Sequence, residues 1–327
     1  MKKTISYVFL GVVLFTTMAV GPSPKAAEKI ILKAVSFQAK DNELTWGTKL
    51  FFNTVNERAK GQLSINFIGG PEVVGPREQF EAVRTGQVDI ASAVTGGYRG
   101  TLPEASMIIM KKDSPWKARE TGYYDLMVQL HKEWGIFYLG ETIWTDPFLI
   151  WLKKPIAKLK DLAGLKIRTG PGEWSDALKA LGAVPVSLSF SDIYSALEKG
   201  LVNGYYWPTL GVLTSGWTEV TKACLLPGVG GQNGVMLINL TAWNRLPKQF
   251  QDLMANAMIE TEKKVAAYQE EKIQKEQSQL KSLGIQFIKL SPPEEKQYIE
   301  TTESALWESF KKICRPEYFE KMRRLSQ

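Results

Sequence analysis

Apolar residues in the first hundred positions repeat with two alternating periods. Short apolar runs at 29–37, 62–70 and 87–94 predict buried strands. Between them, residues 41–61 and 76–86 carry apolar side chains at helical spacing, and each of these segments ends at a glycine. Strands that alternate with helices in this way favour a mostly parallel sheet covered by helices.

The same alternation returns in the middle of the chain. Strands are predicted at 164–170, 183–188 and 201–208, and helices at 173–182 and 189–200 lie between them. We therefore expect an α/β protein that is built from two lobes of similar design.

One long helical pattern follows at 247–283 and stops at Gly284. At about 1.5 Å per residue, this helix would be about 55 Å long, which is more than the width of one lobe. We expect the helix to run along both lobes.

The N-terminus has a basic start, MKK, followed by an uncharged apolar run. This layout is typical of a secretory signal peptide, and the run is short for a membrane span. We predict a signal peptide at residues 1–27, which ends at Ala26 or Ala27. A retained N-terminal anchor stays open as the alternative.

The overall composition is that of an ordinary globular protein, with 44% hydrophobic and 23% charged residues. Loss of residues 1–27, which carry three lysines and no acidic residue, would lower the net charge from +7 to +4. The remaining charges are mixed in sign, and no basic run with interleaved aromatic residues predicts binding of nucleic acid.

Residue types that catalysis usually requires are scarce. His131 is the only histidine, and we expect it on the surface of a helix rather than in a metal site or a catalytic triad. The chain also has no phosphate-binding loop and no nucleophile elbow. Cys224 and Cys314 are the only cysteines; two separate buried thiols are favoured, and a disulfide stays open. We predict no catalytic residue and no cofactor.

Arg168 is the clearest candidate for a binding residue. It lies at the carboxyl end of the predicted strand 164–170, directly before a Thr-Gly-Pro-Gly turn. Open α/β sheets bind ligands at this edge, and the planar guanidinium matches the geometry of a carboxylate. The alternative is a structural ion pair with Glu173 or Asp176, and the spacing alone favours neither role.

Three long segments resemble, in order, the solute-binding proteins of tripartite ATP-independent periplasmic (TRAP) transporters. They begin with GGPEVVGPREQF, LKDLAGLKIRTG and LLPGVGGQNGVM, and the resemblance covers nearly all of the mature chain. It implies a fold of two α/β lobes with mixed sheets, joined by hinge strands around a cleft, with the long helix spanning both. It also implies that Arg168 clamps the carboxylate of an organic acid, for which a bidentate ion pair is the physical basis.

The resemblance also suggests how the chain is divided. Residues 28–150 would form the first lobe, to which about 236–255 return. Residues 151–235 would form the second lobe, with part of 256–327, where the long helix and the C-terminal helices cross both lobes. The mature protein is then expected in the periplasm.

The chain departs from the common family pattern in two places. Many relatives carry a second basic residue in a region where this chain has no Lys or Arg between Gly140 and Lys153. Trp207 stands where many relatives have an asparagine that contacts the ligand. It matches the tryptophan of a keto-acid-binding branch, but Tyr206 replaces the glutamate beside which that branch uses a metal ion. Tyrosine is a poor ligand for hard cations, so we predict no metal.

Both departures point to the same kind of ligand. We predict a monocarboxylate with an apolar or aromatic body, held by Arg168 at one end and packed on rings at the other. Plain core packing is the alternative role for these rings. The candidate ligand-binding residues are Arg168, Trp207, Tyr206, Trp174, Gln38, Ser36, Thr95, Tyr98, Trp144 and Trp151.

The expected function is capture of a small organic acid and its delivery to the membrane permease subunits of a TRAP transporter, without catalysis and without nucleic acid. We expect a monomer, and a dimer stays open. Two other functions also stay open: a periplasmic ligand-binding module that reports to a sensor, and an exported enzyme that acts on small acids.

Overall fold

The computed structural model describes Met1 and residues 29–144, 147–170, 172–231 and 233–326. The predicted signal peptide and its cleavage site lie, apart from Met1, outside the described residues. Within the described ranges, every helix is too short or too polar to cross a bilayer.

The first lobe is built on a five-stranded mixed sheet. Its strand order is β2 (Leu63–Gly69), β1 (Ile30–Ser36), β3 (Ile90–Ala93), β10 (Gly234–Asn239) and β4 (Ile136–Ile143). The first three strands are mutually parallel, and β10 runs antiparallel to both of its neighbours. Helix α1 (Trp46–Arg58) connects β1 to β2, and helix α2 (Gln79–Arg84) connects β2 to β3. Parallel strands need such crossover connections, and the apolar spacing predicts these two helices.

The second lobe is built on a six-stranded mixed sheet. Its strand order is β11 (Gln286–Lys289), β9 (Ala223–Val229), β5 (Phe148–Leu152), β8 (Gly204–Trp207), β6 (Lys166–Thr169) and β7 (Val184–Ser187). Here β5 is antiparallel to both β8 and β9. Helices α5 (Glu173–Ala180) and α6 (Ile193–Glu198) connect the parallel strands β6, β7 and β8.

Further helices cover the two sheets and connect them. The α-helices are α3 (Pro115–Thr121), α4 (Tyr123–Lys132), α7 (Leu240–Arg245), α8 (Lys248–Ser282), α9 (Pro292–Lys311) and α10 (Pro316–Leu325). The 3₁₀ helices are η1 (Glu43–Thr45), η2 (Thr95–Gly97), η3 (Pro103–Met110), η4 (Leu159–Leu162), η5 (Phe190–Asp192) and η6 (Trp217–Glu219).

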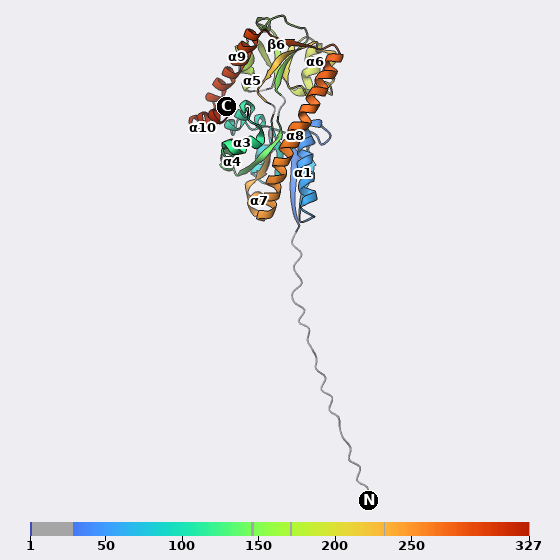
Figure 1. Ribbon diagram of the computed structural model, residues 1–327, viewed down its shortest axis with the longest axis vertical. Helices are drawn as coiled ribbons and strands as arrows, with labels where there is room; N and C mark the ends of the chain where they lie inside the picture. Colours follow the sequence, from blue (N-terminus) through green and yellow to red (C-terminus); the bar gives the residue numbers. More distant parts are fainter. Residues whose placement is uncertain (2–28, 145–146, 171, 232, 327) are drawn as a thin grey trace.

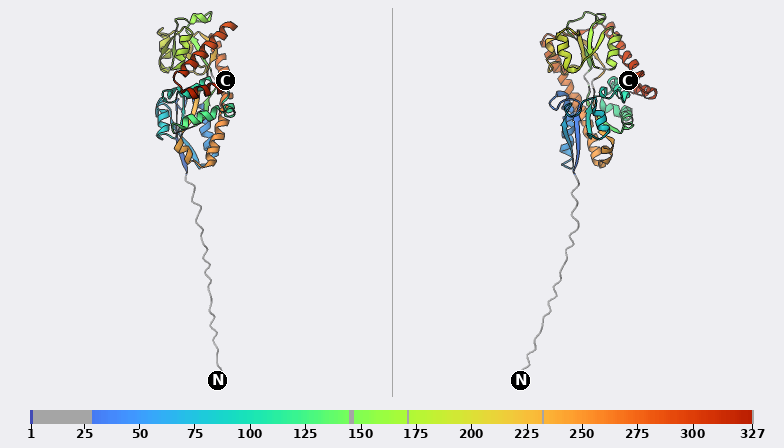
Figure 2. Two further views of the ribbon diagram at one scale, coloured as in Figure 1. Left: turned by 90° about the vertical axis from the view of Figure 1, so that its left-hand side faces the viewer. Right: turned by 180° about the vertical axis from the view of Figure 1, so that it is seen from behind.

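The chain passes between the lobes more than once. It leaves the first sheet after β4, enters the second at β5, and returns from β9 to β10, which lies between β3 and β4 in the first sheet. The lobe boundary expected at residue 150 falls inside β5, all of which pairs in the second sheet. Figures 1 and 2 show the two lobes stacked along the long axis of the molecule.

The long helix α8 spans both lobes, as its predicted length suggests. Its 35 residues correspond to about 52 Å, and Figure 1 shows it running alongside both lobes. Near its start, Phe250 and Met254 are buried in the core of the first lobe with Phe51. Near its end, Leu280 is buried in the core of the second lobe with Trp151. Both lobes therefore pack against the same continuous helix.

A third apolar core joins the lobes on the side covered by α9 and α10. Leu306 of α9 and Phe319 of α10 are buried there together with Met107 of the first lobe and Ile150 of the second. Burial of apolar surface on this scale stabilises the arrangement of the two sheets on that side of the molecule.

His131 is buried, and the expected place on a helix surface is wrong. Its side chain in α4 has no exposed surface. Nδ1 lies 2.7 Å from the carbonyl oxygen of Met127, and Nε2 lies 3.0 Å from the hydroxyl of Tyr98. Because both ring nitrogens have partners, the neutral imidazole can be buried at little cost. Burial lowers the pKa of His131 to about 4.

Cys224 and Cys314 are both buried and do not form a disulfide with each other, as favoured from the sequence. Cys224 belongs to the core of the second lobe, whereas Cys314 lies in the shared core, 3.7 Å from the sulfur of Met107.

The single histidine allows a direct test of its burial. We expect the imidazole of His131 to titrate near pH 4 in the folded protein, against about 6.5 in an unfolded chain. The unfolded state then binds the extra proton first, so the stability that the neutral imidazole contributes is complete above pH 6.5 and is lost as the pH falls to 4. The loss amounts to about 3 kcal/mol.

Proton NMR of the untagged protein measures this titration as one resolved imidazole signal. Urea unfolding between pH 7 and pH 4 should show a weaker pH dependence for His131→Gln than for the parent chain. A titration midpoint near 6.5 in the folded protein would contradict the buried placement.

Candidate functional site

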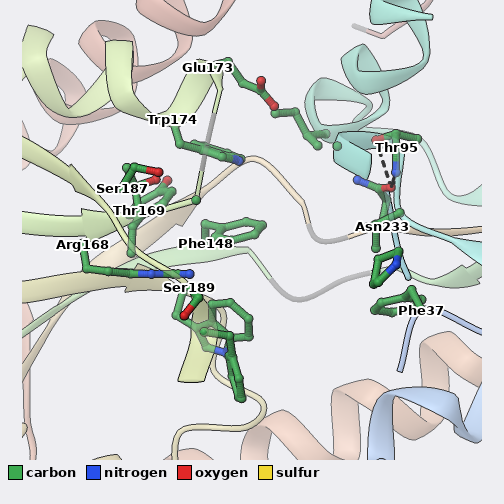
Figure 3. A pocket seen from close by; sticks show the side chains of 18 of the residues that line it. Phe37, Thr95, Phe148, Arg168, Thr169, Glu173, Trp174, Ser187, Ser189 and Asn233 are labelled. Atoms are coloured by element: carbon green, nitrogen blue, oxygen red, sulfur yellow. Dashed lines mark hydrogen bonds between the residues drawn. The ribbon is translucent and has the colours of Figure 1, made fainter. Parts of the chain in front are cut away.

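A cavity of about 550 Å³ lies between the lobes, where the carboxyl ends of their parallel strands face each other. Figure 3 shows its walls approaching from the two sides. The first-lobe side consists of Phe37, Gln38, Pro76, Arg77, Val94, Thr95, Gly96, Ile109 and Asn233. The second-lobe side consists of Phe148, Arg168, Thr169, Gly170, Glu173, Trp174, Ser187, Leu188, Ser189, Phe190, Tyr206 and Trp207.

Arg168 extends from β6 into this cavity (Figure 3). The strand pairs with β7 and β8 on its two sides, so the backbone of Arg168 is fixed between Val186 and Tyr205. Its Nε and Nη2 atoms both donate to the carbonyl oxygen of Leu188, at 3.1 and 2.8 Å. The guanidinium is thereby oriented by one backbone oxygen, and its other edge is left for a partner in the cavity.

The Arg168 charge is buried without an acidic partner among the described residues. The residue is 5% exposed, and neither of the acids considered from the sequence pairs with it. Glu173 pairs with Arg99 at 2.8 Å, and Asp176 pairs with Lys179 at 3.7 Å. The structural ion pair considered as an alternative is therefore wrong.

Desolvation is the main influence on the pKa of Arg168. Burial lowers the pKa of Arg168 to about 10, and the more distant charge of Asp192 acts in the opposite direction. The guanidinium therefore remains charged at neutral pH. A buried cation that lacks a counterion gains strongly from an anion placed beside it.

Three aromatic rings form an apolar wall next to Arg168. The ring of Phe148 lies 4.8 Å from that of Trp174 and 5.4 Å from that of Tyr206, and the last two are 4.9 Å apart. The Tyr206 hydroxyl donates to the carbonyl oxygen of Val229, at 3.3 Å. These rings come from three different elements, β5, α5 and β8, and present their apolar surface to the cavity.

Trp207 also lies next to the guanidinium, with its ring centroid 5.6 Å from the Arg168 Cζ atom. Its indole nitrogen donates to the carbonyl oxygen of Leu210, and its ring packs against Phe190 at 5.0 Å. The aromatic face adds a cation–π contact that favours the charged form of Arg168.

The first-lobe wall is more polar. The carboxamide oxygen of Asn233 accepts from both the backbone nitrogen and the hydroxyl of Thr95, at 3.3 and 3.2 Å (Figure 3). Gln38 follows β1, and the hydroxyl of Ser36 bonds to the Gln38 backbone. Of the ten predicted ligand-binding residues, six line the cavity: Arg168, Trp207, Tyr206, Trp174, Gln38 and Thr95.

The other four predicted residues lie outside the cavity, and two of them support it from behind. Ser36 is buried and shapes the turn that brings Gln38 to the wall. Alternate residues of β5 point to opposite faces of the sheet, and Trp151 points away from the cavity. Its ring is therefore buried in the core of the second lobe and has no exposed surface. Its indole nitrogen donates to the carbonyl oxygen of Trp207 at 2.9 Å.

Tyr98 and Trp144 pack elsewhere in the first lobe. Tyr98 stacks on Phe80 at 4.4 Å and bonds to His131, so its ring points into the lobe interior. The Trp144 ring meets Trp116 edge to face, at 5.8 Å, and its backbone nitrogen donates to Gln269 of α8. For Tyr98, core packing is the role that the structure supports, whereas Trp144 is half-buried and packs on Trp116 away from the cavity.

Sequence reasoning missed several residues of the cavity. Phe37 directly follows strand β1, so its place at a strand end could have identified it. Asn233 directly precedes β10, and the apolar pattern does not show that this strand lies between β3 and β4. Arg77 is the more important omission because it is a second cation at the cavity wall. It is exposed to solvent and lies far from the segment between Gly140 and Lys153, where many relatives carry their second basic residue. Among the described residues, no cluster of three metal-ligating side chains is found.

Comparison with known proteins places the chain in a well-defined group. Residues 35–313 match the family model described as bacterial extracellular solute-binding protein, family 7. The C4-dicarboxylate-binding periplasmic protein DctP of Rhodobacter capsulatus is 25% identical over 249 residues, which cover 73% of each chain. A solute-binding protein of Albidiferax ferrireducens is 26% identical over 224 residues; the match spans 65% of each chain, just under two thirds of that relative.

Solved structures with the same fold are similar over almost the whole chain. A TRAP periplasmic solute-binding protein from Ochrobactrum anthropi has a TM-score of 0.80 at 20% identity, covering 91% of this chain and 95% of that chain. Another, from Desulfovibrio salexigens, has a TM-score of 0.78 at 19% identity, covering 91% of this chain and 100% of that one. The expected two-lobed α/β fold and the resemblance to TRAP solute-binding proteins are confirmed.

The crossing segment after β9 allows a test of how tightly the cavity wall is packed. A Cβ atom on Gly230 would lie 2.5 Å from the Trp174 ring, whereas one on Gly216 would have no neighbour within 4 Å. Both glycines have nearly the same positive φ, +70° and +71°. Gly216→Ala should therefore cost about 1–2 kcal/mol of backbone strain alone. Gly230→Ala should cost about 1–3 kcal/mol more, because Trp174 must move.

Urea unfolding of both variants measures the difference. Equal losses in stability would show that the Trp174 ring is free to give way at this point.

Proposed function

Because the chain belongs to the bacterial extracellular solute-binding proteins of family 7, we propose that it captures a small organic acid in the inter-lobe cavity by means of Arg168. Members of this family are solute receptors rather than enzymes, and those similar to this chain are TRAP periplasmic binding proteins. The observation that carries the proposal is the buried Arg168 guanidinium, which faces the cavity and has no acidic partner among the described residues.

The ligand in this proposal is a monocarboxylate with an apolar or aromatic body. Its carboxylate would accept from the edge of the guanidinium that Leu188 leaves open. Its body would lie against the rings of Phe148, Trp174 and Tyr206, which line the cavity beside that edge. Apolar walls with few fixed polar groups are typical of sites for small molecules.

The ligands of similar proteins agree with the organic-acid class. The solved structure from Desulfovibrio salexigens holds orotic acid, and one from Pseudomonas putida holds D-glucuronate. A receptor from Bordetella pertussis binds pyroglutamic acid. These proteins are less than 20% identical to this chain, so they support a class of ligand and not a particular compound.

Closure of the lobes provides the mechanism. A ligand that contacts both walls has a higher affinity for the closed form, and its binding shifts the population toward that form. Closure excludes water, which strengthens the ion pair between the carboxylate and the guanidinium. The closed receptor then docks on the membrane subunits of a TRAP transporter and releases the acid there. We place the mature protein in the periplasm, after removal of residues 1–27.

Substitution of Arg168 tests the proposal. Arg168→Ala should lower the affinity for any acid that binds the parent protein by about 2–5 kcal/mol, because the carboxylate loses its charged partner inside the cavity. Arg168→Lys should also weaken binding because a lysine lacks the planar fork. A thermal-shift screen of organic acids, which includes orotate and pyroglutamate, followed by calorimetry on the best acid, gives the affinities.

Arg84→Ala is the matched control. Arg84 is exposed and pairs with Glu81 on the surface of α2, so this variant should bind like the parent. Unchanged affinity in both Arg168 variants would rule out the clamp. Turnover of the acid by purified protein would favour the enzyme alternative.

A further inference from the structure

Glu173 brings a carboxylate into a cavity whose other polar end is a cation. It is the first residue of α5, and its side chain lines the cavity although it is buried. Figure 3 shows Glu173 at the top of the site, with the rings of Trp174 and Phe148 between it and Arg168. The cavity therefore has a cationic end, an aromatic middle and a second charged end.

The carboxylate at the second charged end pairs with a residue from the opposite lobe. The Arg99 Nε atom lies 2.8 Å from Oε2 of Glu173. Arg99 follows η2 in the first lobe and is not part of the cavity wall, so a ligand meets Glu173 and not Arg99. The two facing atoms are buried and are not aligned as a hydrogen bond, so the attraction is mainly that of two charges.

The backbone next to the pair fixes its geometry. Gly172 has a φ of +110°, and the Arg99 guanidinium lies against it, 3.6 Å from where a Cβ atom would be. Only glycine adopts this backbone readily. Glu173 is thereby held at the N-terminus of α5, where the helix dipole favours a negative charge. Burial raises the pKa of Glu173, and the charge of Arg99 opposes this rise.

From this arrangement, we propose that Glu173 is a specificity-determining residue that excludes ligands with a second carboxylate at the end remote from Arg168. The inference rests on the proposed function because it assumes that Arg168 holds the first carboxylate. A second carboxylate would lie beside Glu173 in a site with little water, and two like charges repel strongly there. Rejection by such a built-in repulsion is a common basis of specificity.

Arg77 is the group that competes with this explanation. It also lines the cavity and forms no ion pair among the described residues, so it is a potential partner for a second carboxylate. Its side chain is exposed, however, and solvent and salt screen exposed charges far more than buried ones. The buried Glu173 should therefore decide which ligands are accepted.

The test uses two ligands of nearly the same shape, p-toluate and terephthalate, which differ by a methyl group and a carboxylate. Hexanoate and adipate form a second, flexible pair. We expect the full mature chain to bind the monocarboxylate of at least one pair at least tenfold more tightly than the dicarboxylate. Glu173→Gln, which keeps the shape of the side chain, should reduce this preference at least tenfold, because the charge of Arg99 is then free to attract the second carboxylate.

Two further variants identify the cause. The double variant Arg99→Gln, Glu173→Gln removes the attracting cation as well, so it should lose the gain in dicarboxylate affinity. Asp176→Asn is the matched control: it removes a carboxylate from the same helix, but one that is partly exposed and pairs with Lys179, so the preference should not change. Urea unfolding shows whether each variant is folded.

The outcomes separate the two proposals. If the parent chain binds no acid in the screen, including both pairs, the proposed function fails and the inference falls with it. If the parent binds an acid through Arg168 but Glu173→Gln leaves the preference unchanged, only the role of Glu173 is overturned. A parent chain that prefers the dicarboxylate, and loses that preference in Arg77→Gln, would assign the selection to Arg77 and also overturn the inference.

Discussion

The site depends on a buried guanidinium that is held in place by a backbone oxygen. Two nitrogens of Arg168 donate to Leu188, and the pairing of β6 with β7 brings that carbonyl within reach. Folding therefore removes most of the water from a cation before any ligand arrives. The packing of the second lobe offsets the free energy that this desolvation costs. A ligand that supplies an anion meets a partner that is already desolvated and oriented, so it loses little binding energy to reorganisation.

The other features of the cavity are arranged around this cation. The rings of Phe148, Trp174 and Tyr206 keep water away from one side of the charge, and Trp207 covers another. The first lobe supplies neutral polar groups, such as the carboxamide of Asn233. The ion pair between Arg99 and Glu173 joins the two lobes, so a part of the cavity exists only while the lobes are together. In the proposed function, binding and the relative position of the lobes are therefore coupled through the same residues.

Much of the fold could be predicted from the sequence because each helix and strand carries its own apolar period. The apolar period does not give the place of β10, since the insertion of a late strand between two early ones depends on contacts across the chain; only the family resemblance indicated that about 236–255 return to the first lobe. In the site, Arg168 was identifiable from its strand end. Trp151 and Tyr98 lie outside the cavity for different reasons. Both faces of β5 are buried, so alternation of apolar residues does not show which face meets the cavity. Tyr98 follows the short 3₁₀ helix η2, where no strand period applies. Arg77 was missed because it falls within the segment 76–86 that is predicted as a helix, whereas α2 begins only at Gln79.

The position of β10 has a consequence for how the protein is made. This strand separates β3 from β4, so the first sheet remains in two pieces until residue 239 has left the ribosome. An N-terminal fragment that ends within the second lobe exposes the edges of both pieces and has no partner for either. Completion of the first sheet is thus postponed to a late stage of synthesis.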